Sequence, residues 1–495
     1  MEQGTSVSLK KFPDHAGAGA TPENVFLYMQ FTIPSQPDIE HFISLLGTSN
    51  VITDDARKNY AHDETEDLVF VPEVVLVPAD TQQVAAILQY CNEKNIAVTP
   101  RGAGTGLSGG ALPVHGGVLV SMHKFNQILS IDENNLQVTV EPGVITQVLQ
   151  EAVIEKGLYY PPDPSSRGSC FIGGNLAECA GGPRAVKYGV TKDYVLNCEI
   201  VLANGEIMWT GANVLKNSTG YNLTQLMVGS EGTLGIITKI VLKLIPYPPQ
   251  TIVMLIPFAD AENACKAVSA IFKAGIVPSA LEFMERDAID WTLRFKKDIV
   301  LTISDQEKAH LLVEVDGTDM DVLRSTCEKI AEVAEQYHCL NIYYAESADE
   351  KAALWKLRRS VAEAVKSNSV YKEEDTVVPR YHLPELLKGV KEIGNKYGFK
   401  SVCYGHAGDG NLHVNIIKGD LDDVTWNEEL PKGIREIFQL CVQLGGTLSG
   451  EHGIGYVQKQ YMDIAFSPAQ LNLMKEIKKV FDPKGILNPG KIFQD

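Results

Sequence analysis

The hydrophobic and polar positions of residues 81–95 repeat with the period of an amphipathic helix. The apolar face of this helix is formed by Val84, Ile87, Leu88 and Cys91. Thr81 stands where the pattern begins, and a hydroxyl at this position can accept a hydrogen bond from a free backbone N–H group of the first turn. The pattern therefore predicts a helix with Thr81 as its N-cap, followed by a short strand at 96–100.

Short apolar runs predict further strands in the first half of the chain. They lie at 118–122, 136–140, 199–210 and 235–245. The run at 199–210 contains Asn204-Gly205 between two apolar segments, a dipeptide that favours a tight hairpin turn. Three prolines then interrupt the pattern, at Pro246, Pro248 and Pro249, and we place a domain boundary there.

Strand and helix patterns alternate after this boundary, as in a compact α+β module. Strands are predicted at 251–257, 310–316 and 341–345, and helices at 259–274, 320–337 and 351–367. A segment rich in glycine and histidine follows, and the last predicted helix covers 468–481.

Composition narrows the class of protein. The 495 residues suggest about three domain-sized units. With 44 basic and 62 acidic side chains the net charge is −18, which argues against non-specific nucleic-acid binding. None of the nine cysteines forms a C-x-x-C pair, so they are expected to be reduced thiols and not iron–sulfur ligands. We find no transmembrane segment and no signal peptide, and expect a cytoplasmic protein.

The densest glycine cluster is the glycine loop, residues 100–112 (PRGAGTGLSGGAL). Gly104 to Gly109 satisfy G-x-G-x-x-G, but the segment continues into a strand, whereas the dinucleotide fingerprint opens a helix. Such a loop can still surround phosphate oxygens with backbone N–H groups, the alternative being an ordinary turn. A second cluster, at 161–191, brackets a short helix with Gly173-Gly174 and Gly181-Gly182. Two such loops suit a dinucleotide with two phosphates.

Four motifs between residues 71 and 246 resemble the FAD-binding domain of the vanillyl-alcohol oxidase / p-cresol methylhydroxylase superfamily. They are PRGAGTGLSGGA, PPDPSS…IGGNLAECAGGP, KYGVTKDYV and VGSEGTLGIITK. The resemblance implies FAD, and because the glycine loop holds no histidine, it implies that FAD is bound non-covalently. The FAD-binding residues that it implies are Pro100, Arg101, Gly102, Ala103, Gly104, Thr105, Gly106, Leu107, Ser108, Pro162, Asp163, Ser166, Gly173, Gly174, Asn175, Gly181, Gly182, Gly189, Ile237, Asn411 and Asn488.

Residues 401–417 (SVCYGHAGDGNLHVNII) predict a hairpin that turns at Asp409-Gly410. With a two-residue turn, His406 lies directly opposite His413, and their Cβ atoms are about 5 Å apart. Alternation then places Asn415 on the same face as His413, while Leu412, Val414 and Ile416 face the core. The segment 449–455 (SGEHGIG) adds Glu451 and His452. Two imidazoles and one carboxylate are typical of a metal site with open positions.

Three C-terminal motifs, GHAGDGNLHVN, SGEHGIG and FDPKGILNPGKIF, resemble the branch that contains D-lactate dehydrogenase, the D subunit of glycolate oxidase and D-2-hydroxyglutarate dehydrogenase. The resemblance implies a divalent metal (zinc, manganese or iron) bound by His406, His413 and Glu451. It also implies that His452 is the general base and Asn415 a further catalytic amide. Arg358 and Lys372 are the two cations that it implies for the substrate carboxylate. Where the 2-hydroxyglutarate enzymes have a threonine this chain has Ala362, which favours a smaller substrate.

The resemblance also implies an α+β fold with a two-part FAD-binding domain of the p-cresol methylhydroxylase type. The expected organisation is an N-terminal extension (1–37), the FAD-binding domain (38–247), an α+β substrate or cap domain with an antiparallel sheet (248–430), and a C-terminal segment (431–495) that returns to pack on the FAD domain.

The function expected from these motifs is FAD- and metal-dependent oxidation of a small anionic D-2-hydroxy acid, similar to D-lactate or glycolate, by hydride transfer to flavin N5. Electrons are expected to pass to a partner protein or a quinone, and a homodimer is compatible with the sequence. Three alternatives stay open: a D-2-hydroxyglutarate dehydrogenase, a metal-free alcohol or sugar oxidase, and a non-catalytic flavin subunit of a larger complex.

Overall fold

The computed structural model describes residues 31–65 and 68–494. Residues 1–30 of the predicted extension lie outside the described residues, and residues 31–37 lead into helix α1 (Gln36–Leu46). Across the described ranges, no helix combines the length and the apolar character needed to cross a bilayer.

The first sheet is mainly parallel. Its order is β1 (Val51–Ile52), β2 (Val74–Leu76), β4 (Val118–Ser121) and β3 (Val98–Arg101), with β4 parallel to both β2 and β3. Helix α2 (Thr81–Lys94) covers it with the apolar face that the sequence predicts. The predicted N-cap is wrong: the Asp80 carboxylate accepts from Gln83 N at 2.8 Å. Thr81 already belongs to the first turn, and its hydroxyl donates to Glu199 instead.

The second sheet is antiparallel. Its order is β5 (Ile128–Asp132), β6 (Gln137–Val140), β10 (Ile236–Lys243), β8 (Val195–Val201) and β9 (Ile207–Trp209). The hairpin between β8 and β9 turns at Asn204-Gly205 as predicted, with Gly205 at φ +85°. A two-stranded sheet pairs β7 (Leu158–Tyr159) with β11 (Ile245–Pro246). The helices of this part are α3 (Thr146–Ile154), α4 (Ile172–Glu178), α5 (Ala185–Tyr188) and α6 (Leu223–Met227).

The third sheet, called here the cap sheet, is antiparallel throughout. Its order is β15 (Tyr343–Ala345), β12 (Gln250–Phe258), β14 (Ala309–Gly317), β13 (Ala280–Glu285), β17 (Lys400–His406), β18 (Asn411–Ile417) and β16 (Tyr371–Val377). Alternation along β12 sends Ile252 and Met254 to one face and Val253 and Leu255 to the other. The sheet is therefore buried on both faces.

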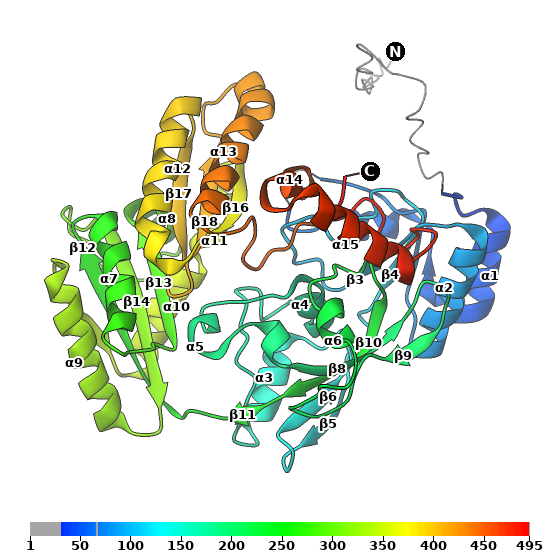
Figure 1. The fold of residues 1–495 in the computed structure, drawn as a ribbon, viewed down its shortest axis with the longest axis horizontal. Helices are drawn as coiled ribbons and strands as arrows, with labels where there is room; N and C mark the ends of the chain where they lie inside the picture. The colour runs from blue at the N-terminus through cyan, green and yellow to red at the C-terminus, as the bar shows by residue number, and fades with distance from the viewer. Residues whose placement is uncertain (1–30, 66–67, 495) are drawn as a thin grey trace, which may run out of the picture. The chain divides into compact units, whose positions relative to one another are not determined.

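Helices cover both faces of the cap sheet (Figure 1). The face of Ile252 packs against α7 (Ala261–Lys273), α9 (Met320–Gln336), α12 (Leu383–Tyr397) and α13 (Leu430–Gln443). The face of Val253 packs against α8 (Arg286–Phe295), α10 (Ala348–Arg359) and α11 (Val361–Asn368). The helix predicted at 351–367 is divided at Ser360 into α10 and α11. The predicted α+β class and the antiparallel sheet are confirmed, although β13, β16, α8, α12 and α13 were not predicted from the sequence.

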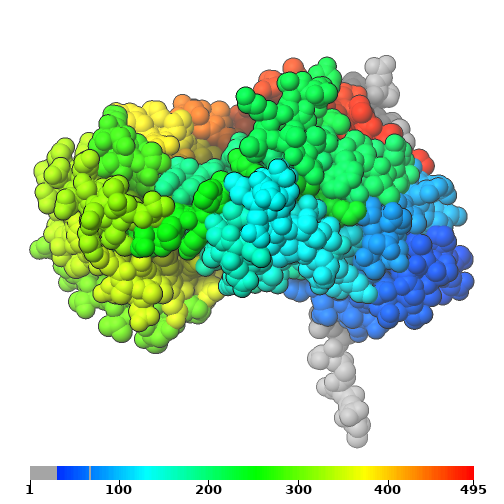
Figure 2. All heavy atoms as spheres, turned by 90° about the horizontal axis from the view of Figure 1, so that it is seen from below, coloured from blue at the N-terminus to red at the C-terminus, as the bar shows by residue number. Residues whose placement is uncertain are grey.

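The C-terminal residues pack in two places. Helix α13 contributes Ile434 and Phe438 to the cap-sheet core. After the short helix α14 (Met462–Ala465), helix α15 (Pro468–Phe481) lies beside the N-terminal half of the chain (Figure 1, Figure 2). There Lys478 Nζ donates to Thr233 O at 2.7 Å, and Leu487 pairs with β3 through Val98. The chain therefore returns to the first part of the fold only after α13, whereas the sequence predicted that it returns from residue 431 onward.

Candidate active site

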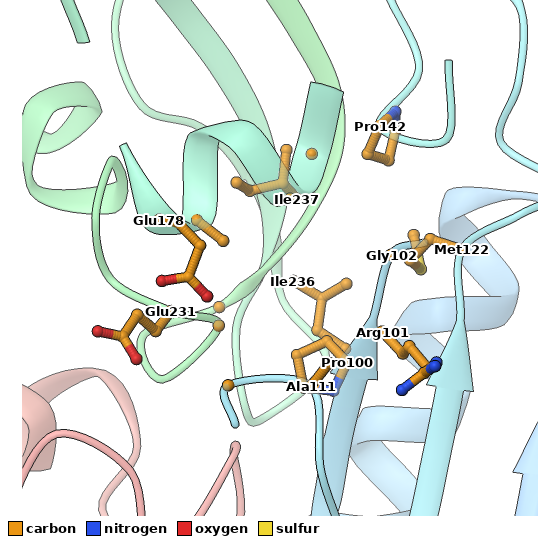
Figure 3. A pocket seen from close by; sticks show the side chains of 16 residues that line it. Pro100, Arg101, Gly102, Ala111, Met122, Pro142, Glu178, Glu231, Ile236 and Ile237 are labelled. Carbon is orange, nitrogen blue, oxygen red and sulfur yellow. The ribbon is translucent and has the colours of Figure 1, made fainter. Parts of the chain in front are cut away.

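A cavity of about 530 Å³ is walled by the backbone of the glycine loop and of residues 164–171. Between β3 and β4 the chain forms no helix, as the sequence predicts. Gly104 has φ +76°, and a Cβ there would overlap the Arg101 guanidinium, so only glycine fits this turn. A smaller cavity of about 100 Å³ is drawn in Figure 3. Its lining shares Gly102, Ala111, Gly174 and Glu178 with that of the first cavity. The two cavities share lining residues and include many glycines, whose backbone N–H groups suit the phosphates of a dinucleotide.

The predicted cofactor residues divide into two groups. Those that line the two cavities are Pro100, Arg101, Gly102, Ala103, Gly104, Thr105, Gly106, Leu107, Ser166, Gly173, Gly174, Asn175 and Ile237. Those that do not line them are Ser108, Pro162, Asp163, Gly181, Gly182, Gly189, Asn411 and Asn488. Several of the second group hold neighbouring segments: Asn488 Nδ2 donates to Gly110 O and Glu231 O, and Asp163 Oδ2 lies 2.9 Å from Arg359 Nη2.

The histidine hairpin has a different register from the predicted one. His406 pairs with Asn411, and His413 pairs with Tyr404. The turn spans the four residues between β17 and β18, two more than predicted. Because the register differs by two residues, an even number, each side chain keeps its face. His406 and His413 therefore become diagonal neighbours, with ring centroids 5.2 Å apart. Asn415 shares their face, and Leu412, Val414 and Ile416 face the core as predicted.

His406 is fixed between two carboxylates. Its Nδ1 lies 2.9 Å from both oxygens of Glu282 on the adjacent strand β13, and its Nε2 lies 3.1 Å from Glu451 Oε1. Burial by itself lowers the pKa of His406, but these two carboxylates raise it well above its ordinary value. A carboxylate behind a ligating histidine is the arrangement that orients metal-binding imidazoles.

His413 lies on the other side of Glu451. Its Nε2 is 3.6 Å from Glu451 Oε1, and its Nδ1 is 3.4 Å from Glu373 Oε1. The ring of His452 stacks on that of His413, with centroids 5.1 Å apart and planes at 13°. Burial and the two neighbouring histidines lower the pKa of His413 to about 3, so this imidazole stays neutral and free to ligate.

The donor set fits a divalent cation. Ligand atoms of His406, His413 and Glu451 all lie within 4.8 Å of one another. Burial raises the pKa of Glu451, but the three nearby histidines outweigh it and bring the pKa to about 2, so the group is a carboxylate at neutral pH. Two imidazoles and a carboxylate suit zinc, manganese or iron. The alternative set of Glu373, His413 and His452 meets the same distance criterion.

Asp375 holds the segment that carries Glu451 and His452. It pairs with His413 across β16 and β18. Its Oδ2 accepts four hydrogen bonds of 2.7–2.9 Å, from Ser449 Oγ and from the backbone N–H groups of Gly450, Glu451 and His452. Burial raises the pKa of Asp375, but His452, His413 and these donors together bring it far below its ordinary value. One buried carboxylate thus places the predicted base and the predicted third ligand.

We expect the Asp375→Ala variant to lose about 1–3 kcal/mol of unfolding free energy, because the backbone N–H groups of Gly450, Glu451 and His452 lose the carboxylate oxygen that accepts from them. Segment 449–455 should also become sensitive to proteases. Denaturant titration and limited proteolysis measure both effects. The matched control is Glu374→Gln on the opposite face of β16, where the amide can still accept from Gln458 Nε2. Equal stability of the alanine variant and the wild-type protein would contradict the anchoring role.

The two predicted carboxylate-binding cations lie in different places. Arg358 lines the larger cavity, where its Nη2 contacts Glu282 Oε2 at 2.6 Å and its buried Nε has no hydrogen-bond partner among the described residues. Lys372 does not line this cavity: its ammonium lies 5.2 Å from the Trp426 ring centroid, within the core of the opposite face. Side chains alternate along β16, so Glu373 lines the cavity beside the histidines, while Lys372, predicted to hold the substrate carboxylate, does not.

Several residues of the site were not predicted from the sequence. Glu282 belongs to a strand that was not predicted, 124 positions from His406. Glu373 and Asp375 belong to the polar run YKEED. Such a run suggests a solvent-exposed segment unless it is recognised as a strand, in which every second side chain faces the same side. The predicted Asn415 is fully buried, and both polar atoms of its amide lack hydrogen-bond partners in the described part of the chain.

Comparison with known sequences identifies the family. Residues 72–211 match the family described as "FAD binding domain", and residues 247–492 match "FAD linked oxidases, C-terminal domain". The glycolate oxidase subunit GlcD of Bacillus subtilis (strain 168) is 39% identical over 458 residues, 92% of this chain and 96% of that protein. The D-lactate dehydrogenase of Anaerostipes hadrus is 38% identical over 459 residues, with the same coverage. The chain belongs to the FAD-linked oxidase family.

This FAD-linked oxidase also shares its fold with p-cresol methylhydroxylase. The TM-score is 0.74 at 19% identity, over 92% of this chain and 96% of that one. At such low identity the likeness concerns the fold alone. The predicted family membership and the predicted α+β fold of the p-cresol methylhydroxylase type are confirmed, and the FAD-linked oxidase is an FAD-dependent oxidoreductase.

Proposed function

We propose that this FAD-linked oxidase oxidises a small D-2-hydroxy acid to the 2-oxo acid, with a divalent metal on His406, His413 and Glu451. The observation that carries the proposal is that Arg358, His413, Glu451 and His452 line the same cavity as the glycine loop. One space thus combines a free guanidinium donor, a candidate metal set and a candidate base with the backbone walls suited to FAD. The relatives named for glycolate oxidation and D-lactate dehydrogenation support this substrate class.

Arg358 is the candidate group for the substrate carboxylate. A guanidinium presents several N–H donors in a plane that matches a carboxylate, and the buried Nε of Arg358 has no hydrogen-bond partner among the described residues. Glu282 neutralises part of its charge, and the Tyr404 ring packs 4.9 Å from the guanidinium carbon. Ala362 also lines the cavity, and its small side chain adds no polar group for a second carboxylate. These features favour a lactate-like or glycolate-like substrate.

His452 is the candidate general base. Burial lowers its pKa, but Asp375, Glu373 and Glu451 raise it above the ordinary value, which strengthens the imidazole as a proton acceptor. In the proposed reaction His452 takes the hydroxyl proton while Cα loses a hydride and the C–O bond becomes a carbonyl. When bound, FAD supplies the two-electron acceptor for that hydride. A bound divalent metal supplies a Lewis acid for the substrate hydroxyl. The electrons then leave to a separate acceptor.

The test is anaerobic loss of the visible flavin absorbance on addition of D-lactate, glycolate, D-2-hydroxyglutarate or a simple sugar or alcohol. We expect bleaching by the small D-2-hydroxy acids. In the Arg358→Leu variant the half-saturating concentration should rise about 10–100-fold, because a charge-assisted hydrogen bond is lost. The matched control is Lys372→Met, which we expect to bleach like the wild-type protein because Lys372 lies on the opposite face.

Each contrary result has a distinct meaning. Preferential bleaching by D-2-hydroxyglutarate would replace the small substrate with a dicarboxylate. Bleaching by sugars or alcohols alone would indicate a metal-free oxidase. An intact flavin spectrum with every compound would indicate a non-catalytic flavin subunit and reject the proposal.

A further inference from the structure

Glu178 is a cavity-lining acid that the proposed reaction does not use. It ends helix α4 and lines both cavities. Its Oε2 is buried and has no hydrogen-bond partner among the described residues. In Figure 3 its carboxyl group lies near that of Glu231. A buried carboxylate without a donor is costly in free energy, so this group requires an explanation.

The immediate surroundings of Glu178 are backbone and a second acid. Its carboxyl group lies against Gly110, where a Cβ would be 2.7 Å from Oε1, and against Gly453, where a Cβ would overlap Oε2. The glycine loop between residues 102 and 112 contains no ionisable side chain. The segment behind Gly453 carries Glu451 and His452, whose side chains turn to the other histidines.

Glu231 is bound differently from Glu178. Its carboxylate accepts from Ile454 N at 2.8 Å and from Gly455 N at 2.6 Å. Hydrogen bonds from N–H groups favour the ionised form of an acid, so the negative charge of the pair belongs on Glu231. Two adjacent buried carboxylates resist double ionisation, and the proton of the pair therefore belongs on Glu178.

The other charged groups nearby do not reverse this assignment. Burial raises the pKa of Glu178 well above its ordinary value, and the charges of Glu231 and Asp63 raise it further. Lys491 acts in the opposite direction. Its ammonium, however, donates to Leu112 O at 2.6 Å and to Asn488 Oδ1 at 3.1 Å.

We propose that Glu178 is a neutral carboxyl group whose O–H donates a hydrogen bond to bound FAD. The phosphate, ribityl and flavin oxygens of FAD are hydrogen-bond acceptors, and an ionised carboxylate against them would be repulsive. A neutral carboxyl group supplies a further donor beside the backbone N–H groups of the glycine loop and the Thr105 hydroxyl. The proposal depends on the FAD-binding cavity, and it is independent of which substrate is oxidised.

The test measures the FAD dissociation constant of the apoprotein by flavin fluorescence between about pH 6 and pH 9, a range above the ordinary pKa of a carboxyl group. Glu178→Gln keeps a donor of similar shape and should bind FAD as tightly as the wild-type protein near neutral pH. Glu178→Leu removes the donor and should weaken binding about tenfold. Glu332→Gln is the control, because Glu332 is an exposed residue of α9 that lines neither cavity.

The pH profile supplies an independent readout. A raised pKa means that Glu178 keeps its proton at low pH and loses it as pH rises, so wild-type FAD affinity should fall toward pH 9 relative to Glu178→Gln. Tenfold weaker binding by Glu178→Gln near neutral pH, or parallel pH profiles of the two proteins, would overturn the proposal. Wild-type affinity in a folded Glu178→Leu would overturn it as well. If Glu178→Leu does not fold, the comparison of the other two proteins decides. No substrate is added, so failure of the proposed reaction does not affect the result.

Discussion

The His452→Ala variant is expected to lower kcat by about 10²–10⁴-fold, the range typical for loss of a general base. The His452 ring lies in the cavity wall, stacked on His413, and its backbone N–H is fixed by Asp375. Burial lowers the pKa of His452, but the surrounding carboxylates raise it above the ordinary value, which favours uptake of the hydroxyl proton. The loss should fall on the chemical step, because Arg358 would still hold the substrate carboxylate.

Anaerobic stopped-flow reduction of the flavin measures this step directly. The FAD content of the variant must match that of the wild-type protein, so that a lost cofactor is not mistaken for a lost base. The control is His382→Ala, a histidine paired with Glu385 that does not line either cavity. Flavin reduction at a near-normal rate in His452→Ala would remove His452 from the mechanism.

Removal of the metal with a chelator should abolish turnover and leave the flavin spectrum of the protein unchanged. His406, His413 and Glu451 converge within 4.8 Å, and four carboxylates surround the histidines: Glu282, Glu373, Asp375 and Glu451. Loss of a Lewis acid that contributes several kcal/mol lowers the rate by at least about 10²-fold.

Metal analysis of purified protein provides the second measurement. We expect one divalent ion per chain, its loss in His406→Ala, and its retention in His310→Ala, a buried histidine paired with Glu307 outside the site. Activity should return when the chelated protein receives zinc, manganese or iron. Full turnover by metal-free protein would refute the metal site, and the reaction would then depend on His452 and the flavin alone.

The sequence by itself determined the local features of the site. The glycine loop was expected to join two strands without a helix, because its composition offers backbone N–H groups and no helical pattern. The two histidines were expected on one face of a hairpin because side chains alternate with a period of two. This prediction is correct although the predicted turn length is wrong, because a register difference of two residues leaves each side chain on the same face of the sheet.

Only the tertiary structure decided which carboxylates meet the histidines. Lys372 and Glu373 are adjacent in a polar run, and the packing of β16 against β18 selected Glu373 for the cavity. Glu282 reaches His406 because β13 lies beside β17, and Asp375 reaches Gly450 because a distant segment crosses the end of β16. Side-chain alternation is a local property of one strand. The order of strands in a sheet depends on contacts between residues far apart in the chain, and no local pattern encodes it.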